Sequence, residues 1–513
     1  MPADRAALCA ALAALCLALS SPAGAQDTIG SPQSAIPWLS DSLAAPRAAA
    51  SAPAEPAATP LAETEVTTME LGRTRRDAVG LLPASVTGLP RDALEGSDPD
   101  RLAELIARQP GDAIPAMQDL WLAILLAELD PPRAASDPDA LFFARVDGLL
   151  RFGAVDQAQA LLERAGATDA AAFRRWWDTS LLTGYDDRAC AAMTANPGVA
   201  PTLPARIFCL SRTGDWAAAA LTLDTGRALG AISEEEDRLL AHFLDPELFE
   251  GEPPPEPPRP MTPLAFRLLD GIGETPPTRD LPLAFAAADL RPTTGWKAQI
   301  EAAERLVRRR ALDPNRLLAL YTERRPSASG GVWDRAAAIQ ALDTSLIAGD
   351  RDAVADTLPA AVTAMRGAGL LVPFAAMYGE ALAQARLDGP AAELALRVGL
   401  LSPSYEAVAR GAEPDLPRDR FAVAVAMGAV AGAEVPPGPL PRAIADGLTG
   451  PAPAPLQRLA AEGRLGEALL EAELMLAGGA EADPKDVAEA LAFFRAVGLV
   501  DVARRAALQL LLG

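Results

Sequence analysis

The chain has 513 residues, is 50% hydrophobic and 5% aromatic, and carries a formal net charge of −22 from 68 acidic and 46 basic residues. This apolar content is enough for packed cores, and the abundance of Ala and Leu over aromatic and β-branched residues favours helices and excludes an all-β fold. The acidic balance argues against nucleic-acid binding, because such a charge repels phosphate backbones.

The first 25 residues have the pattern of a cleavable secretory signal. Arg5 precedes an uncharged stretch over residues 6–19, and Ala23-Gly24-Ala25 forms a small-residue cleavage site. The apolar stretch is shorter than the roughly 20 residues that a membrane span needs. We therefore expect cleavage after Ala25, export to the periplasm or secretion, and no stable membrane insertion afterwards. Retention as an uncleaved anchor is the alternative.

The mature chain is predicted to begin with a tether and to continue as helices. Residues 26–96 are rich in Ala, Pro and Ser, which is typical of a mostly disordered segment. Amphipathic helical patterns follow, and they are interrupted by a proline-rich loop at 251–263 and a proline-rich linker at 435–455. These interruptions divide the helical region into three blocks: 97–250, 264–434 and 456–513.

Several predicted helices begin with the same local signal. An Asp at the N-cap precedes a Pro at the first helical position, where the missing N–H has no cost. This pair occurs at Asp98-Pro99, Asp137-Pro138, Asp313-Pro314 and Asp483-Pro484. Ser233 and Glu236 have the spacing of a capping box, in which each side chain satisfies the other residue's backbone N–H.

The predicted turns between helices share a glycine that is followed five residues later by an alanine. The pairs are Gly153 and Ala158, Gly214 and Ala219, Gly463 and Ala468, and Gly498 and Ala503. The glycine can end one helix in a left-handed conformation, and the small alanine lets the next helix pack closely. The pattern resembles the helix A to helix B turn of tetratricopeptide repeats. The turns are unevenly spaced, so we predict an all-α fold, an irregular α-solenoid of helix hairpins after the disordered tether.

Two cysteines, Cys190 and Cys209, remain after removal of the signal. They lie in two predicted helices at similar distances from the breaker-rich segment 196–203 between them. In an antiparallel hairpin they would therefore face each other, and an oxidising compartment would permit a disulfide. Two buried free thiols are the alternative.

The sequence offers few residues for catalysis. His242 is the only histidine, which excludes an HExxH zinc site and a histidine-rich metal cluster, and it lies in an apolar helical run that favours a structural role. There is no G-x-S-x-G nucleophile motif, no P-loop and no dinucleotide fingerprint. We therefore expect no enzymatic activity, no catalytic or metal-ligating residue and no cofactor.

A few residues are candidates for groove or loop contacts. Ser329, Gly330 and Gly331 could present backbone N–H groups to an anion, with Arg335 nearby; the alternative is a tight loop between packed helices. Adjacent Trp176 and Trp177 could line a groove, although they point about 100° apart on a helix, which favours a core position for at least one. The basic run at 308–310 is interpreted as a solvated helix C-terminus.

The leading functional hypothesis is an exported, non-enzymatic interaction scaffold with a solenoid groove that binds an envelope protein or peptide. The alternative is a peptidoglycan-active or peptidoglycan-binding protein, because the exported Ala-rich helical chain resembles superhelical lytic transglycosylases. Their Glu-Ser and Gly-Leu-Met-Gln motifs do not occur in this sequence.

Overall fold

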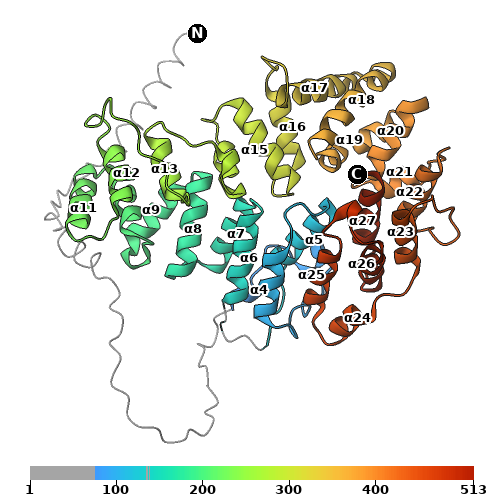
Figure 1. Cartoon of the computed structure of the whole chain (residues 1–513), viewed down its shortest axis with the longest axis horizontal. Coiled ribbons are helices and arrows are strands. Elements are labelled where there is room, and N and C mark those ends of the chain that lie inside the picture. Colours follow the sequence, from blue (N-terminus) through green and yellow to red (C-terminus); the bar gives the residue numbers. More distant parts are fainter. Residues whose placement is uncertain (1–74, 134–136, 138) are drawn as a thin grey trace, which may run out of the picture. The chain divides into compact units, whose positions relative to one another are not determined.

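The structure, a computed structural model, describes residues 75–133, 137 and 139–513 of the chain. Within these residues every regular element is a helix, and β pairing is confined to an isolated bridge between Leu82 and Ala127. Short helices follow one another, and most pack against a neighbour in sequence (Figure 1). The predicted all-α fold of irregular helix pairs is confirmed. The signal segment and the tether before residue 75 lie outside the described residues.

The N-terminal part of the described chain runs through twelve elements up to residue 244. They are η1 Arg76–Ala78, α3 Ala84–Thr87, α4 Pro99–Arg108, α5 Pro115–Leu126, α6 Ala140–Arg151, α7 Val155–Ala165, α8 Ala170–Thr183, α9 Asp186–Ala195, η2 Pro197–Val199, α10 Leu203–Arg212, α11 Trp216–Ala228 and α12 Glu234–Leu244. Helix α7 packs on α8, and α10 packs on α11, as expected for hairpins.

The middle of the chain begins after the irregular segment 245–262. Its elements are α13 Pro263–Gly271, η3 Thr278–Asp280, η4 Leu283–Phe285, α14 Ala286–Asp289, α15 Trp296–Arg308, α16 Pro314–Glu323, α17 Val332–Ala348, α18 Arg351–Gly367, α19 Leu371–Gln384, α20 Gly389–Leu400, α21 Tyr405–Ala409 and α22 Pro417–Met427. The C-terminal elements are α23 Pro439–Thr449, α24 Ala454–Ala461, α25 Leu465–Met475, η5 Gly479–Glu481, α26 Pro484–Ala496 and α27 Val500–Leu512.

The glycine–alanine junctions form as predicted. Each of the four glycines has a positive φ, between 77° for Gly463 and 89° for Gly498. The alanine five residues later has no exposed surface in any of the four pairs, so it lies where two helices touch. A larger side chain at these alanines would force the helices apart. The four are Ala158, Ala219, Ala468 and Ala503.

The helix-start signals also hold, with one difference. Asp98, Asp313 and Asp483 each cap a helix and accept a hydrogen bond from the N–H two residues later. Ser233 and Glu236 form the predicted capping box at the start of α12. Near Asp137, however, helix α6 begins only at Ala140, and Asp137 instead accepts a hydrogen bond from the Asp139 N–H at 3.0 Å.

Residues 75–96 differ from the predicted disordered tether, because they pack against the helices. Asp77 is buried, and its carboxylate accepts a 2.7 Å hydrogen bond from the backbone N–H of Phe142 in α6. Leu94 is buried and lies against Gly466, whose missing side chain leaves it room. The apolar residues of this segment have no helical period, so the local sequence does not predict which helices they contact.

The segment 435–455 also differs from the predicted linker, because helix α23 occupies most of it and packs extensively on α26. Pro439 and Pro441 fall in the first turn of α23, where the absent N–H groups would have no helical partner in any case. Proline density therefore marks a helix start here. The 251–263 segment does form a loop, and α13 begins at its last residue.

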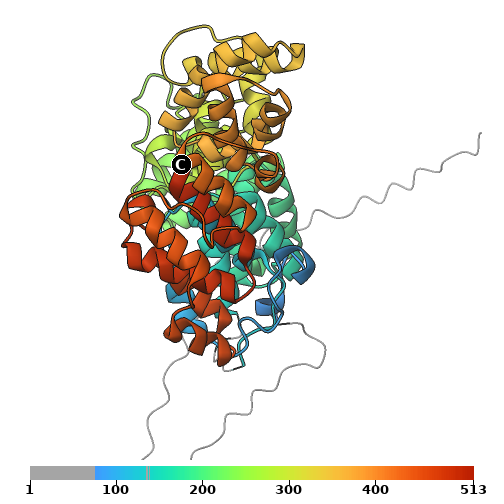
Figure 2. The same ribbon diagram turned by 90° about the vertical axis from the view of Figure 1, so that its right-hand side faces the viewer.

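The helical path returns to its start. Helix α25 packs on α4 and α5, and α27 packs on α5, which places the last helices beside the first (Figures 1 and 2). Gln109 after α4 donates a buried 2.9 Å hydrogen bond to the Leu470 carbonyl of α25. The Ala116 N–H donates to the Gln509 side chain of α27 at 2.8 Å. These polar contacts fix how the first helices, α4 and α5, align with the last ones, α25 and α27.

None of the helices in the described part of the chain combines the length with the apolar character that membrane crossing requires.

Candidate functional site

The predicted disulfide is present. Cys190 of α9 and Cys209 of α10 are bonded, with their Cα atoms 5.1 Å apart, and both residues are buried. The bond ties together the two helices on either side of the 196–203 turn, as their symmetric placement indicated. A disulfide is compatible with an oxidising compartment.

In the glycine loop before α17, the Gly330 amide already has a partner. The Gly330 N–H donates a 2.8 Å hydrogen bond to the carboxylate of Asp334, while Ser329 and Gly331 are exposed. Arg335 points instead to Glu304 of α15, to which it donates two hydrogen bonds of 2.7 and 2.5 Å. The structure therefore does not bring Arg335 and the loop amides together around a shared anion position.

Trp176 and Trp177 lie in the core of the α8 region. Trp177 is 2% exposed and packs edge-on against Phe208, while Trp176 is 9% exposed and donates a 3.1 Å hydrogen bond from Nε1 to Glu163. Of the two interpretations, the core position that was favoured for at least one tryptophan applies to both, because each side chain fills space between helices and neither lines a groove.

His242 also has local partners. Its Nδ1 lies 2.8 Å from the Arg238 carbonyl, and its ring stacks on Phe249 at 4.0 Å. Among the residues that the structure describes, no group of three or more His, Cys, Asp or Glu side chains is placed to hold a metal ion.

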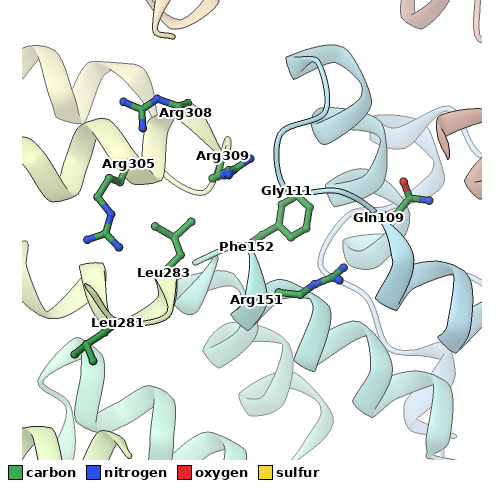
Figure 3. A pocket seen from close by; sticks show the side chains of 9 residues that line it. All are labelled: Gln109, Gly111, Arg151, Phe152, Leu281, Leu283, Arg305, Arg308 and Arg309. Atoms are coloured by element: carbon green, nitrogen blue, oxygen red, sulfur yellow. The ribbon is translucent and has the colours of Figure 1, made fainter. Parts of the chain in front are cut away.

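A cavity that the sequence did not predict lies at the C-terminal end of α15. It has a volume of about 310 Å³, and its arginines come from two helices: Arg305 and Arg308 from α15, with Arg309 directly after it, and Arg151 from the end of α6. Phe152 and Leu283 supply apolar wall, and Gly111 of the α4–α5 loop lies beside the Phe152 ring, across from Arg305 and Leu281 (Figure 3). Residues more than 150 positions apart in sequence thus share one opening.

A second cavity of about 390 Å³ adjoins the first, because Arg308 and Arg309 line both. It adds Arg366 from α18 and an apolar wall that includes Ile114, Leu371 and Leu510. We call the two cavities together the arginine pocket. It lies where α5, α15, the α18–α19 turn and the C-terminal helix α27 come together.

The pocket arginines are poorly neutralised. Arg308 Nε donates to the Ala368 carbonyl at 2.8 Å, and Arg305 donates to the Thr278 hydroxyl at 3.2 Å; neither bond neutralises the charge. Within the described residues, no hydrogen bond or ion pair is formed by the guanidinium groups of Arg309 and Arg366. By contrast, the next residue, Arg310, forms a 2.6 Å ion pair with Asp119 outside the pocket.

Burial and charge act together on these guanidinium groups. Burial lowers the pKa of Arg305 and of Arg309, and the positive charge of Arg308 lowers both further. The carboxylates of Asp289 and Asp280 raise the pKa of Arg305, and that of Asp112 raises the pKa of Arg309. Burial also lowers the pKa of Arg151. An arginine nevertheless keeps its charge at neutral pH. The pocket is therefore a concentration of positive charge in a chain of net charge −22.

The side chains in the pocket are held in place by the surrounding backbone. Atoms of the Arg309 guanidinium lie 3.2 Å from the position that a Cβ of residue 111 would occupy, so Gly111 allows their close approach. Arg151 donates to the carbonyls of Ile106 and Ala107 at the end of α4, and its guanidinium lies 5.5 Å from the Phe152 ring centroid. The walls are therefore largely pre-formed.

The run 308–310 was visible in the sequence but was interpreted as a solvated helix end. Helix α15 does end at Arg308, and Arg310 adopts a left-handed φ of 59° that turns the chain away. The side chains are half-buried because the α4–α5 loop and the α18–α19 turn cover them. Three consecutive arginines in an acidic chain were the available signal, but the covering segments are distant in sequence.

Comparisons with known proteins identify no relative: no family model matches the chain, and no curated protein or solved structure matches it significantly.

Proposed function

We propose that the protein is an exported, non-enzymatic interaction scaffold that binds a protein, peptide or polymer of the cell envelope. The observation that carries this proposal is the composition of the arginine pocket. Its guanidinium groups are charged hydrogen-bond donors and its apolar walls add contact area, and both are features of binding sites. A guanidinium does not act as a proton acceptor at neutral pH, so these groups suit recognition better than proton transfer.

The architecture supports the same role. Consecutive helix pairs with glycine–alanine junctions resemble degenerate tetratricopeptide repeats, and stacked helix pairs offer extended surfaces to partners. Export follows from the signal pattern over residues 1–25, and the Cys190–Cys209 bond suits the oxidising space beyond the cytoplasm.

Crosslinking in intact cells, followed by affinity purification of the protein, tests the scaffold role. We expect a reproducible envelope partner that is captured by the wild type but recovered less with the double variant Arg309→Gln/Arg366→Gln. The matched control is Arg324→Gln/Arg325→Gln, which also removes two positive charges, from exposed positions after α16. Turnover of purified peptidoglycan would overturn the non-enzymatic proposal and favour the lytic transglycosylase alternative.

A further inference from the structure

We propose that the arginine pocket binds a small polyanion that carries phosphate or carboxylate groups. The inference deepens the proposed function and rests on it, because it names the chemistry through which the scaffold recognises its ligand. The ligand is either a free small molecule or the end group of a larger envelope component, since both present the same oxygen atoms to the arginines.

The first argument is the supply of unused hydrogen-bond donors. Each guanidinium has five N–H donors in a planar fork that matches the oxygens of phosphate or carboxylate. Arg308 uses its Nε on the Ala368 carbonyl, and no acceptor in the described residues occupies those of Arg309 or Arg366. A single monovalent anion would leave most of these donors free, so several anionic groups on one ligand fit better.

The second argument is that a structural role for these arginines would call for counter-ions. Elsewhere in the chain, several half-buried arginines have them: Arg335 pairs with Glu304, and Arg397 pairs with Asp419. Buried Arg145 is held differently, by hydrogen bonds to three backbone carbonyls.

Among the described residues that line the two cavities, Asp112 is the one acidic side chain, and the main-chain carboxyl group of Gly513 also lines the second cavity; neither forms an ion pair with Arg309. Arg308 and Arg309 are half-buried like charges without an ion pair in the described part of the chain, whereas Arg366 is exposed. Such neighbouring charges destabilise the fold, and a bound polyanion would relieve that repulsion.

The third argument is size and wall chemistry. Cavities of about 310 and 390 Å³ are in the range that small-molecule sites occupy. Phe152 and Leu283 in one cavity, and Ile114 and Leu371 in the other, would contact a carbon skeleton between the anionic groups. A long acidic polymer would instead need an open groove with repeated basic residues along it.

Titration calorimetry of the purified protein at low ionic strength, with pyrophosphate and with citrate as probes, tests the proposal. We expect saturable 1:1 binding of at least one probe, weakened by added salt and weakened roughly tenfold by Arg309→Gln. The Arg325→Gln control should bind as the wild type does. Preference for pyrophosphate assigns phosphate chemistry, and preference for citrate assigns carboxylate chemistry.

Binding to neither probe, or equal weakening in Arg309→Gln and Arg325→Gln, would overturn the proposal. Because Arg309 contributes no ion pair to the described fold and lies beside the like charge of Arg308, its replacement should not lower the melting temperature of the unliganded protein, and relief of the repulsion should raise it; circular dichroism checks this. Capture of an envelope partner that neither probe displaces would overturn the polyanion site while leaving the scaffold role intact. Displacement of a captured partner by a probe would identify its end group as the ligand.

Discussion

Replacing Glu473 with glutamine isolates the effect of a carboxyl group buried in helix α25. Glu473 is 1% exposed, and neither of its carboxyl oxygens has a hydrogen-bond partner among the described residues. Burial therefore raises the pKa of this carboxyl well above its ordinary value. In the unfolded chain the same group ionises with a pKa near 4.5, so unfolding above that pH releases a proton.

The sign and size of the effect follow from this difference. The folded pKa is raised, so the wild-type stability is unaffected below the unfolded pKa and falls as pH rises towards the folded pKa. Each pH unit between the two values lowers the free energy of unfolding by about 1.4 kcal/mol. Glutamine has a similar shape and no proton to lose. Glu473→Gln should therefore match the wild type at low pH and become progressively more stable than it at higher pH.

Urea unfolding of the two proteins at a series of pH values measures this difference directly. Glu471→Gln is the control, because Glu471 lies two residues away on the same helix, is partly exposed and pairs with Arg101 at 3.0 Å. Loss of that exposed pair should cost less than about 1 kcal/mol, so the effect of Glu471→Gln should stay small at every pH of the series. If the difference in free energy of unfolding between Glu473→Gln and the wild type stays constant with pH, the conclusion that Glu473 is buried and protonated is refuted.

Three further predictions concern the disulfide, a helix junction and the pocket. Replacing both Cys190 and Cys209 with serine should lower the free energy of unfolding by about 3 kcal/mol for a separation of 19 residues, and thiol labelling of the denatured, unreduced wild type should find neither cysteine free. Ala219→Leu should destabilise by about 1 to 3 kcal/mol, whereas Leu at exposed Ala220 on the same helix should change stability by less than about 0.5 kcal/mol; equal melting curves would contradict the packed junction. Asp112→Asn should tighten pyrophosphate or citrate binding roughly twofold to fivefold by calorimetry, since it removes a carboxylate that lines the second cavity, and weaker binding would contradict that role.

The features that the sequence predicted well are those encoded within a few residues. An Asp before a Pro caps α4, α16 and α26, because the carboxylate needs only the N–H groups of the following turn. Gly214 ends one helix with a positive φ, and the small side chain of Ala219 lets the next helix pack closely. Both features belong to one junction of six residues, so the local sequence predicts them together. The disulfide was predictable for the same reason: two helices joined by a short turn have few ways to pack.

What the sequence could not predict depends on which distant helices meet. The crossing angles between successive helix pairs add up along the chain. The residue types at any one junction do not show which distant helices the total change of direction brings together. The contact of α25 and α27 with α4 and α5 is such a result, and so are the partners of Leu94 and the packing of α23 on α26. Local composition instead indicated a tether and a linker at 75–96 and 435–455.

The arginine pocket depends on that return contact. Gln109 lines the first cavity and also donates to the Leu470 carbonyl of α25, while Gln509 lines the second and accepts from the Ala116 N–H. The residues that join the first and last helices are thus also residues of the pocket walls. A polyanion bound to Arg308 and Arg309 would contact both walls at once, and any ligand that binds only the folded state stabilises it by mass action. Binding at this pocket should therefore resist the separation of α27 from α5, which links recognition to the contact that holds the two ends of the helical stack together.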